Sequence, residues 1–273
     1  MFGMLAFTVC GKQPAAHFFD EKKIWDSSEQ PYPYRVCFEP IIRYFPRPIA
    51  LSDVLDLGDK GRIWTFDLGS FRLKNHNPIT ADEGKELIRL LLRNNPISYP
   101  LRPIPQPYPA STDSLPLAFE TGSKGHMKYE GFLNAWFMRG FVNGRFKETI
   151  GEYRDFLNFV PTTFNKVMDI FLTHVTEVDG VDILHKFTCI ELKTGICVEE
   201  DLNQIVKYEN WLVRKLADGD SEMVQSILVG FDFDDKVMEY VRKRRLIEEK
   251  TVRLLQYQVI ASRDDIQLTE IES

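Results

Sequence analysis

Apolar and polar residues alternate over residues 189–193, a pattern that predicts a β-strand with one packed face and one polar face. Because strand side chains alternate between the two faces of a sheet, Ile190 and Leu192 point one way while Glu191 and Lys193 point the other. The polar face of this strand therefore presents a carboxylate and an ammonium group two positions apart.

A second apolar run, over residues 181–184, carries Asp182 and predicts a neighbouring strand. On two adjacent strands, Asp182, Glu191 and Lys193 would converge on one side of the sheet. Carboxylate oxygens are preferred ligands of Mg²⁺ and Mn²⁺, and a nearby lysine can orient or help to deprotonate an attacking water. The pattern therefore predicts a metal-assisted hydrolytic site.

Asp169 is an alternative first acid, because it also precedes an apolar pair. Residues 160–174 nevertheless fit a helix that is entered through Pro161 and Thr162. We therefore expect Asp182, and not Asp169, to be the first acidic ligand.

Further periodic segments outline the rest of the chain. In the C-terminal part, helices are expected over 125–139 and 234–250, and a buried strand over 225–231. In the N-terminal part, short strands are expected over 4–9, 35–40 and 61–66, followed by a helix over 81–92 that ends before Pro96. The N-terminal part is thus predicted to be β-rich.

A proline-rich segment divides the chain. Seven prolines lie between Pro96 and Pro116, a density that prevents regular helix or central strand and favours an extended spacer. The expected organisation is an N-terminal domain over 1–96, a linker over 97–127, a second domain over 128–261 and a polar tail over 262–273.

Composition restricts the class of protein. The sequence has 273 residues, 44% of them hydrophobic, and no apolar run approaches the roughly 20 residues that span a bilayer. It lacks the features of a signal peptide, so a cytoplasmic location and no membrane partner are expected. The four cysteines form no C-x-x-C pair, so we expect buried thiols. The net charge of -6 argues against indiscriminate binding of polyanions.

The C-terminal part resembles the PD-(D/E)xK nuclease superfamily over roughly residues 125–260. The resemblance rests on Asp182, on the Glu191-x-Lys193 triplet, and on the Gln-x-x-x-Tyr motif of Gln204 and Tyr208. Residues four positions apart share one face of a helix. The Gln-x-x-x-Tyr motif is similar to that of the RecB-like and archaeal NucS-like branch. The resemblance implies an α/β restriction-endonuclease-like domain. It also implies that Asp182, Glu191 and the upstream acid Glu130 bind Mg²⁺ or Mn²⁺, and that DNA is the partner. Many nucleases of this superfamily cut as dimers, but the sequence does not decide whether this chain forms a homodimer.

The N-terminal part resembles an EVE domain of the PUA-like superfamily, through Lys23-Ile24-Trp25 and Tyr32-Pro33-Tyr34-Arg35-Val36. The resemblance implies a pocketed β-barrel that holds a nucleobase, often a modified one. Such domains have one or two further strands before the position of Met4, so the barrel is incomplete here or begins upstream. Candidate aromatic platforms for a base are Trp25, Tyr32, Tyr34 and Trp64. Arg35 and Lys207 are candidate nucleic-acid contacts.

Taken together, the two resemblances imply a metal-dependent endodeoxyribonuclease whose N-terminal domain senses a base, in restriction or DNA repair. A repair nuclease whose N-terminal domain only binds or dimerises is one alternative. A nucleic-acid-binding protein with an inactive nuclease fold is the other. The basic run 242–245 is either a phosphate track or a solvated helix face with i, i+4 partners.

Overall fold

The structure is a computed structural model of the 273-residue chain. It describes residues 15–17, 34–36, 43–44, 47, 49–65, 78–96, 99–100, 119–260 and 265–271. The chain divides into two compact units, one formed by residues 1–64 and 81–116 and the other by residues 65–80 and 117–273.

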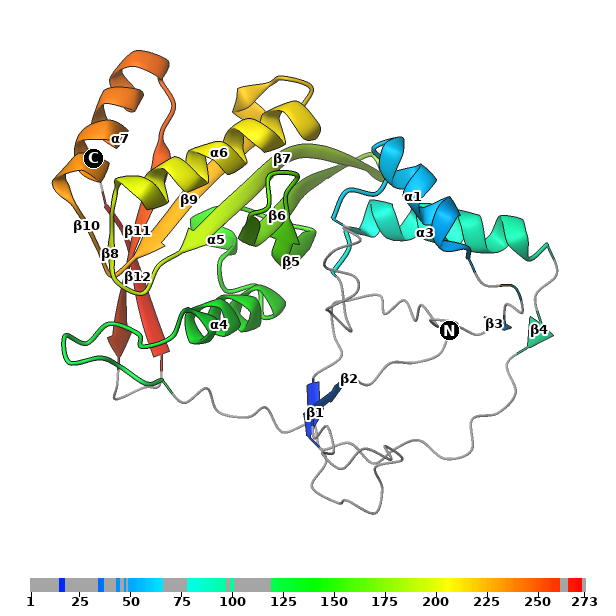
Figure 1. The fold of residues 1–273 in the computed structure, drawn as a ribbon, viewed down its shortest axis with the longest axis horizontal. Coiled ribbons are helices and arrows are strands. Elements are labelled where there is room, and N and C mark those ends of the chain that lie inside the picture. The colour runs from blue at the N-terminus through cyan, green and yellow to red at the C-terminus, as the bar shows by residue number, and fades with distance from the viewer. Residues whose placement is uncertain are drawn as a thin grey trace. The chain divides into compact units, whose positions relative to one another are not determined.

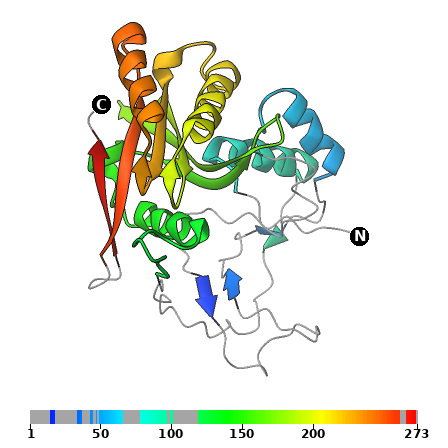
Figure 2. The same ribbon diagram turned by 60° about the vertical axis from the view of Figure 1, so that its left-hand side comes forward.

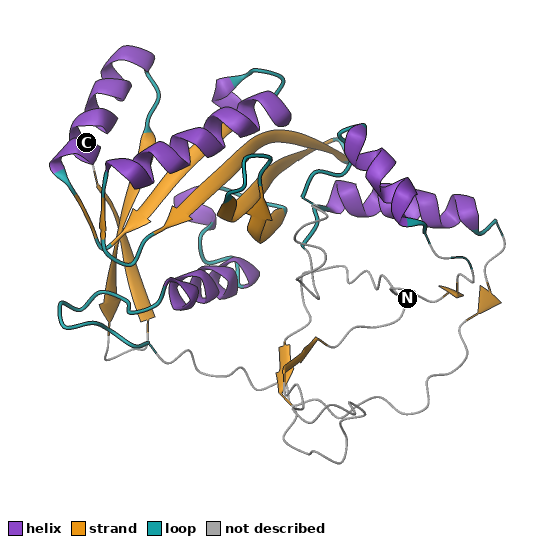
Figure 3. Ribbon diagram, viewed as in Figure 1, coloured by secondary structure: helices purple, strands orange, loops and turns teal. Residues whose placement is uncertain are grey.

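A six-stranded mixed sheet forms the centre of the second unit, with strand order β12-β11-β9-β7-β6-β5 (Figures 1 and 3). The strands are β5 (Asp155–Pro161), β6 (Val167–Val178), β7 (Val181–Leu192), β9 (Val224–Gly230), β11 (Val252–Ile260) and β12 (Asp265–Ile271). Strands β7, β9 and β11 are parallel, while β5, β6 and β7 run alternately up and down and β12 is antiparallel to β11. The fold of this unit is therefore mixed α/β.

Helices cover both faces of this sheet (Figures 1 and 2). One face carries α4 (Glu130–Val142), whose Trp136, Phe137 and Phe141 pack in one core cluster with Ile190 and Leu192 of β7. The other face carries α6 (Glu199–Lys215) and α7 (Asp235–Glu248). The unit is completed by α5 (Lys147–Ile150), the 3-10 turn η2 (Ser221–Met223), and strands β8 (Ile196–Cys197) and β10 (Asp232–Phe233), which pair in parallel.

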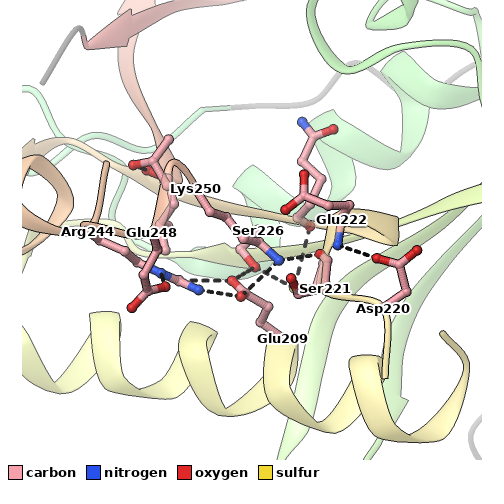
Figure 4. A network of polar contacts seen from close by, with 12 residues as sticks. Glu209, Asp220, Ser221, Glu222, Ser226, Arg244, Glu248 and Lys250 are labelled. Atoms are coloured by element: carbon pink, nitrogen blue, oxygen red, sulfur yellow. Dashed lines mark hydrogen bonds and ion pairs between the residues drawn. The ribbon is translucent and has the colours of Figure 1, made fainter. Parts of the chain in front are cut away.

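A buried ionic network joins α6 to α7 and β9 (Figure 4). Glu209, 2% exposed, accepts hydrogen bonds from Arg244 at 2.6 and 3.1 Å and from Ser226 at 2.7 Å. Lys250 lies 3.2 Å from the same carboxylate and donates to the carbonyl of Ser221. Burial alone would raise the pKa of Glu209, but these partners lower it, so the carboxylate stays charged.

Among its described residues, the first unit has the helices α1 (Leu51–Asp59) and α3 (Ala81–Asn94). Its four described strands are short: β1 (Ala15–His17) pairs with β2 (Tyr34–Val36), and β3 (Arg43–Tyr44) pairs with β4 (Tyr99–Pro100). The predicted helix over 81–92 is confirmed. The predicted strand over 61–66 is wrong for its described part, because a turn follows α1 and residues 63–64 lie outside any strand. The strand predicted over 4–9 lies outside the described residues.

Four other predictions concern the second unit. The strand over 225–231 and the helix over 234–250 are confirmed as β9 and α7, and the helix over 125–139 begins only at Glu130. The helix over 160–174 is wrong, because this segment holds the end of β5, a turn and the start of β6. Residues 168–174 are all buried, and a continuous apolar run does not distinguish a buried strand from a helix.

Part of the expected polar tail belongs to the central sheet, since residues 265–271 form edge strand β12. Asp265 fixes its start. The Asp265 carboxylate accepts the indole N–H of Trp136 at 2.8 Å and a two-pronged contact from Arg145 at 2.7 and 2.9 Å. Within the described residues, no helix is long and apolar enough to cross a membrane.

Candidate active site

Two buried carboxylates, on Asp169 and Glu191, face each other across β6 and β7. The register pairs Ile170 with Ile190, so Asp169 and Glu191 each lie one position beyond this pair. The backbone N–H of Leu192 donates to Asp169 at 2.8 Å. Burial raises the pKa of both acids, and the charge of Asp169 helps to raise the pKa of Glu191 to about 8.

Lys193 brings a positive charge to this pair. Its Nζ lies 2.6 Å from Glu191 Oε1, 3.8 Å from Glu130 Oε2 and 3.9 Å from Asp201 Oδ1. Burial opposes the charged form of Lys193, but the contact with Glu191 outweighs it, and the pKa of Lys193 is raised. At neutral pH the side chain is therefore an ammonium ion that donates hydrogen bonds.

Helix α6 supplies two further predicted residues. The amide of Gln204 donates to Glu191 Oε1 at 2.7 Å and to the hydroxyl of Tyr208 at 2.9 Å. The Tyr208 hydroxyl donates to the carbonyl of Val167 at 2.8 Å, and burial raises the pKa of this phenol. Gln204 and Tyr208 thus lie on one face of α6, and that face contacts Glu191. Their side chains hold α6 against Glu191 and the start of β6.

Helix α4 approaches the site through Glu130 and Asn134, one turn apart. Glu130 is 44% exposed, and burial followed by the charge of Asp169 raises its pKa. Asn134 is 4% exposed, donates to the backbone carbonyl of Asp169 at 3.3 Å and accepts from Asn158 at 3.3 Å. Asn134 thus fixes the distance between α4 and β6 where the acid lies.

The backbone across from Asp169 adopts an uncommon conformation. The ladder pairs Asn158 with Ile170 and Val160 with Met168, and Phe159, between them, has φ of 55°. Non-glycine residues seldom adopt positive φ, and such positions gather at functional sites.

The predicted convergence of Asp182 with Glu191 and Lys193 is wrong. Asp182 and Glu191 lie on the same strand, β7, nine positions apart, which at about 3.3 Å per residue corresponds to roughly 30 Å. Asp182 is an exposed residue opposite Glu177, and its carboxylate lies 3.6 Å from Arg154. Because 181–192 is one long strand, the acid on the neighbouring strand comes from β6 and is Asp169.

Comparisons with known proteins leave the family open. No protein family model matches the chain, and no curated protein matches it. It is similar to a solved structure of a repair endonuclease from Pyrococcus abyssi, with 18% sequence identity and a TM-score of 0.28. The match covers 39% of this chain and 42% of that chain, so it spans less than half the length of that protein. At this TM-score the similarity does not define a common topology.

The residues present fit a divalent cation. Glu191 Oε2 is buried and has no hydrogen-bond partner within the described part of the chain. Two buried carboxylates this close together repel each other unless one takes up a proton or both bind a cation. Mg²⁺ is commonly bound by oxygen atoms from one or two carboxylates of a protein. Among the described residues, no three acidic, histidine or cysteine side chains already form a metal-binding group. The ammonium of Lys193 lies among the carboxylates of Glu191, Glu130 and Asp201.

The remaining predicted contacts lie elsewhere. Trp25 is outside the described residues, and Tyr34 and Arg35 lie in β2, of which only the backbone is described. Lys207 is exposed on α6, one residue before Tyr208. In the 242–245 run, exposed Lys243 pairs with Glu239 one turn away, as expected for a solvated helix face. Arg244 is instead buried and pairs with Glu209 of α6 as well as with Glu248, which neither interpretation anticipated.

Two polar residues at the site, Asn134 and Asp201, were not predicted from the sequence. Asp201 has a detectable signal, because it lies in the acidic first turn of α6, where its side chain accepts the backbone N–H of Val198 at 3.0 Å. Asn134 has a weaker one: it lies four residues after Glu130 and therefore shares a helix face with it.

Proposed function

We propose that this protein is a Mg²⁺- or Mn²⁺-dependent nuclease that hydrolyses phosphodiester bonds in DNA. The proposal rests on one observation, the orphaned oxygen of buried Glu191 beside Asp169 and Lys193. Two desolvated carboxylates with a spare oxygen provide a place for a hard divalent cation. The adjacent ammonium provides a partner for a phosphate oxygen.

In this proposal, Asp169 and Glu191 hold the cation, with Glu130 available at the solvent side. A cation bound there would stabilise negative charge on the phosphate and favour formation of hydroxide from water. Glu130 is the solvent-side ligand in this proposal, because its carboxylate is 44% exposed and lies 3.8 Å from Lys193.

Lys193 would act as a hydrogen-bond donor in the metal-free state. Its raised pKa keeps it protonated at neutral pH, so it can orient a water or neutralise phosphate charge but cannot accept a proton. Gln204 would hold Glu191 Oε1, which leaves Oε2 free to face the cation. Tyr208 would hold Gln204 in turn.

The second candidate is a nucleic-acid-binding protein without activity. It is favoured by the position of Lys193, whose ammonium already forms a 2.6 Å ion pair with Glu191. If this ion pair neutralises Glu191 sufficiently, the acidic pair attracts no cation and the fold is inactive.

Cleavage assays on the purified protein separate the two candidates. Wild type, Glu191→Gln and Lys193→Ala are incubated with Mg²⁺ or Mn²⁺ and with plain, mismatched, single-stranded and base-modified DNA. Glu239→Gln is the matched control, because Glu239 is an exposed acid on α7. Metal-dependent cleavage that Glu191→Gln and Lys193→Ala lose and Glu239→Gln keeps supports the nuclease. Binding without cleavage in all four proteins supports the second candidate.

Base sensing by the N-terminal part stays a prediction. The same DNA panel tests it, since faster cleavage of one modified DNA that Trp25→Ala abolishes would support a sensor of modified bases. Equal cleavage of plain and modified DNA would instead favour a nuclease in repair.

A further inference from the structure

The side chain of Tyr257, on β11, joins the two segments that carry Glu130 and Lys193. It is fully buried, in the core cluster that includes the buried side chains of α4. Its hydroxyl accepts the backbone N–H of Met127 at 2.8 Å and donates to the backbone carbonyl of Thr194 at 2.6 Å. One hydroxyl therefore connects two main-chain positions that lie far apart in the sequence.

The first of these positions directly follows Lys193. Strand β7 ends at Leu192, and the next three residues form the turn into β8. The Lys193 N–H donates to the carbonyl of Val229 at 2.9 Å, and the Tyr257 hydroxyl holds the carbonyl of Thr194. The backbone of Lys193 is thus held on one side by a neighbouring strand and on the other by a side chain. Because a lysine side chain has many rotamers, a fixed backbone limits where its ammonium can lie.

The second position lies three residues before Glu130. Met127 is fully buried, and α4 begins at Glu130 without a hydrogen bond from the side chain of its N-cap residue. The segment before the helix is a narrow turn closed by the bridge between Thr121 and Met127. The N–H of Met127 donates outside this turn, to Tyr257. The hydroxyl consequently anchors the turn that leads into α4, and with it the carboxylate of Glu130.

We propose that the Tyr257 hydroxyl positions Glu130 against Lys193 so that the metal site assembles with its third carboxylate in place, an inference that rests on the proposed nuclease function. The carboxylate of Glu130 lies 3.8 Å from the ammonium of Lys193, and both segments are held by the same hydroxyl. Both partners of this hydroxyl are main-chain groups, so Tyr257 is a positioning residue and not a metal ligand. Burial raises the pKa of Tyr257 to about 12, so its hydroxyl keeps its proton at neutral pH and remains a donor to Thr194.

Tyr153 provides a matched control within the same core. Its hydroxyl donates to the carbonyl of Phe141 at 2.8 Å, and its side chain packs against the cluster that contains Tyr257. Phe141 lies near the C-terminal end of α4, eleven residues after Glu130, which in a helix corresponds to about 16 Å. Tyr153→Phe therefore removes a hydroxyl-to-carbonyl bond from the same core without changing a contact of the segments around Glu130 and Lys193.

Three measurements on the full chain compare wild type, Tyr257→Phe and Tyr153→Phe. Urea unfolding measures stability, calorimetric titration with Mn²⁺ measures metal binding, and amide hydrogen exchange without metal measures local opening of the two segments. Both substitutions should lower the urea midpoint of unfolding, because each removes a hydrogen bond from the core. A purely structural role of Tyr257 predicts this loss of stability and no change in metal binding beyond that of Tyr153→Phe.

Tyr257→Phe should also weaken Mn²⁺ binding by about tenfold, the lower end of the range for contacts around metal ligands, because the hydroxyl acts through the main chain. Amide exchange should become faster at Met127 and at the start of α4. Tyr153→Phe should keep the wild-type Mn²⁺ affinity and the wild-type exchange at these positions. Unchanged Mn²⁺ affinity in Tyr257→Phe, or an equal loss in Tyr153→Phe, would overturn the proposal.

A double-mutant cycle with Glu130→Gln tests whether the hydroxyl acts through this carboxylate. Glu130→Gln alone should weaken Mn²⁺ binding, because one charged ligand is lost. Addition of Tyr257→Phe should then weaken binding less than it does in wild type, since the effects of two residues that act through each other do not add. The same loss of affinity in both backgrounds would show that Tyr257 does not position Glu130, and the proposal would be wrong.

The two proposals fail separately. If Tyr257→Phe weakens Mn²⁺ binding as expected but wild type cuts no DNA, the hydroxyl positions a metal site and the nuclease function is wrong. If cleavage depends on Glu191 while Mn²⁺ affinity does not depend on Tyr257, the nuclease function holds and the positioning role is wrong. A wild-type protein that binds no Mn²⁺ would overturn both.

Discussion

The backbone N–H of Leu192 donates to the carboxylate of Asp169 across two adjacent strands, at 2.8 Å. This bond places an acid of β6 beside Glu191 and fixes one Asp169 oxygen by a main-chain donor. Its geometry depends on the strand register, which sets Leu192 near Asp169, and on the rotamer of the Asp169 side chain. The position of the first acid is therefore built into the pairing of β6 with β7.

Asp169→Asn and Asp182→Asn form a matched pair of variants. If the proposed function holds, Asp169→Asn should lower the rate of cleavage by on the order of 100-fold or more, because a charged ligand is lost and the cation that offsets the phosphate charge is held less tightly. Asp182→Asn should cut like wild type, since Asp182 lies at the far, exposed end of β7. Rates are measured with Mg²⁺ on a labelled DNA. A loss in Asp182→Asn alone would restore the sequence-based assignment.

Tyr208→Phe tests the support that α6 gives to the site. The substitution removes the hydroxyl that contacts Gln204 and the Val167 carbonyl, so the free energy of unfolding should fall by about 1 kcal/mol or more. Cleavage should slow by about 10- to 100-fold, since the hydroxyl that positions Gln204, which in turn holds the proposed metal ligand Glu191, is lost. Tyr240→Phe, on exposed α7, should change neither quantity. Unchanged cleavage in Tyr208→Phe would show that Gln204 holds Glu191 unaided.

Glu209→Gln should be among the most destabilising changes in the second unit. It leaves Arg244 and Lys250 without their buried carboxylate, and breaking one side of a buried pair costs about 3 to 5 kcal/mol. Glu239→Gln breaks the exposed pair with Lys243 and should cost under about 1 kcal/mol. Urea unfolding of both variants gives the comparison. Similar losses would mean that the buried network adds little.

Asp265 should make stability depend on acid pH. The Arg145 guanidinium is the main cause that lowers the pKa of Asp265 to about 2 in the folded protein, against an ordinary value of 3.8. The resulting stabilisation is fully present above pH 3.8 and is lost as the pH falls through about 2. Because the carboxylate is partly exposed, we expect about 1 to 2 kcal/mol.

The measurement for Asp265 compares urea unfolding of wild type and Asp265→Asn between pH 2 and pH 7. The difference in unfolding free energy should be largest at neutral pH and should shrink toward pH 2. A difference that does not change with pH would show that hydrogen-bond geometry, and not charge, is responsible.

The sequence could predict local periodicity in the second unit but not the length of its longest strands. The Glu191-x-Lys193 alternation, the Gln204 and Tyr208 spacing, and the segments that became β9 and α7 all follow from contacts within a few residues. Asp169 could not be chosen in this way, because β6 is buried on both faces and carries no alternation at 168–174. The choice between Asp169 and Asp182 depends on register, which only the pairing of Ile170 with Ile190 reveals.

The polar tail illustrates a different limit. Residues 265–269 do alternate between polar and apolar side chains, a strand signal that the description as a polar tail passed over. The contacts of Asp265 with Trp136 and Arg145, which lie about 120 to 130 residues earlier in the sequence, could not be predicted. Contacts between residues so far apart in the sequence produce no pattern in the residues around either partner. The same holds for Asn134, whose partner is the backbone of Asp169.

Strand β12 forms one edge of the central sheet, where it pairs with β11 along its whole length. A chain cut before Asp265 would leave β11 with an open row of N–H and C=O groups next to buried Leu254, Leu255 and Tyr257. Such an edge pairs readily with a second copy of itself. The short acidic tail therefore shields the sheet from self-association, and a truncated protein should aggregate at concentrations where the full chain stays dispersed.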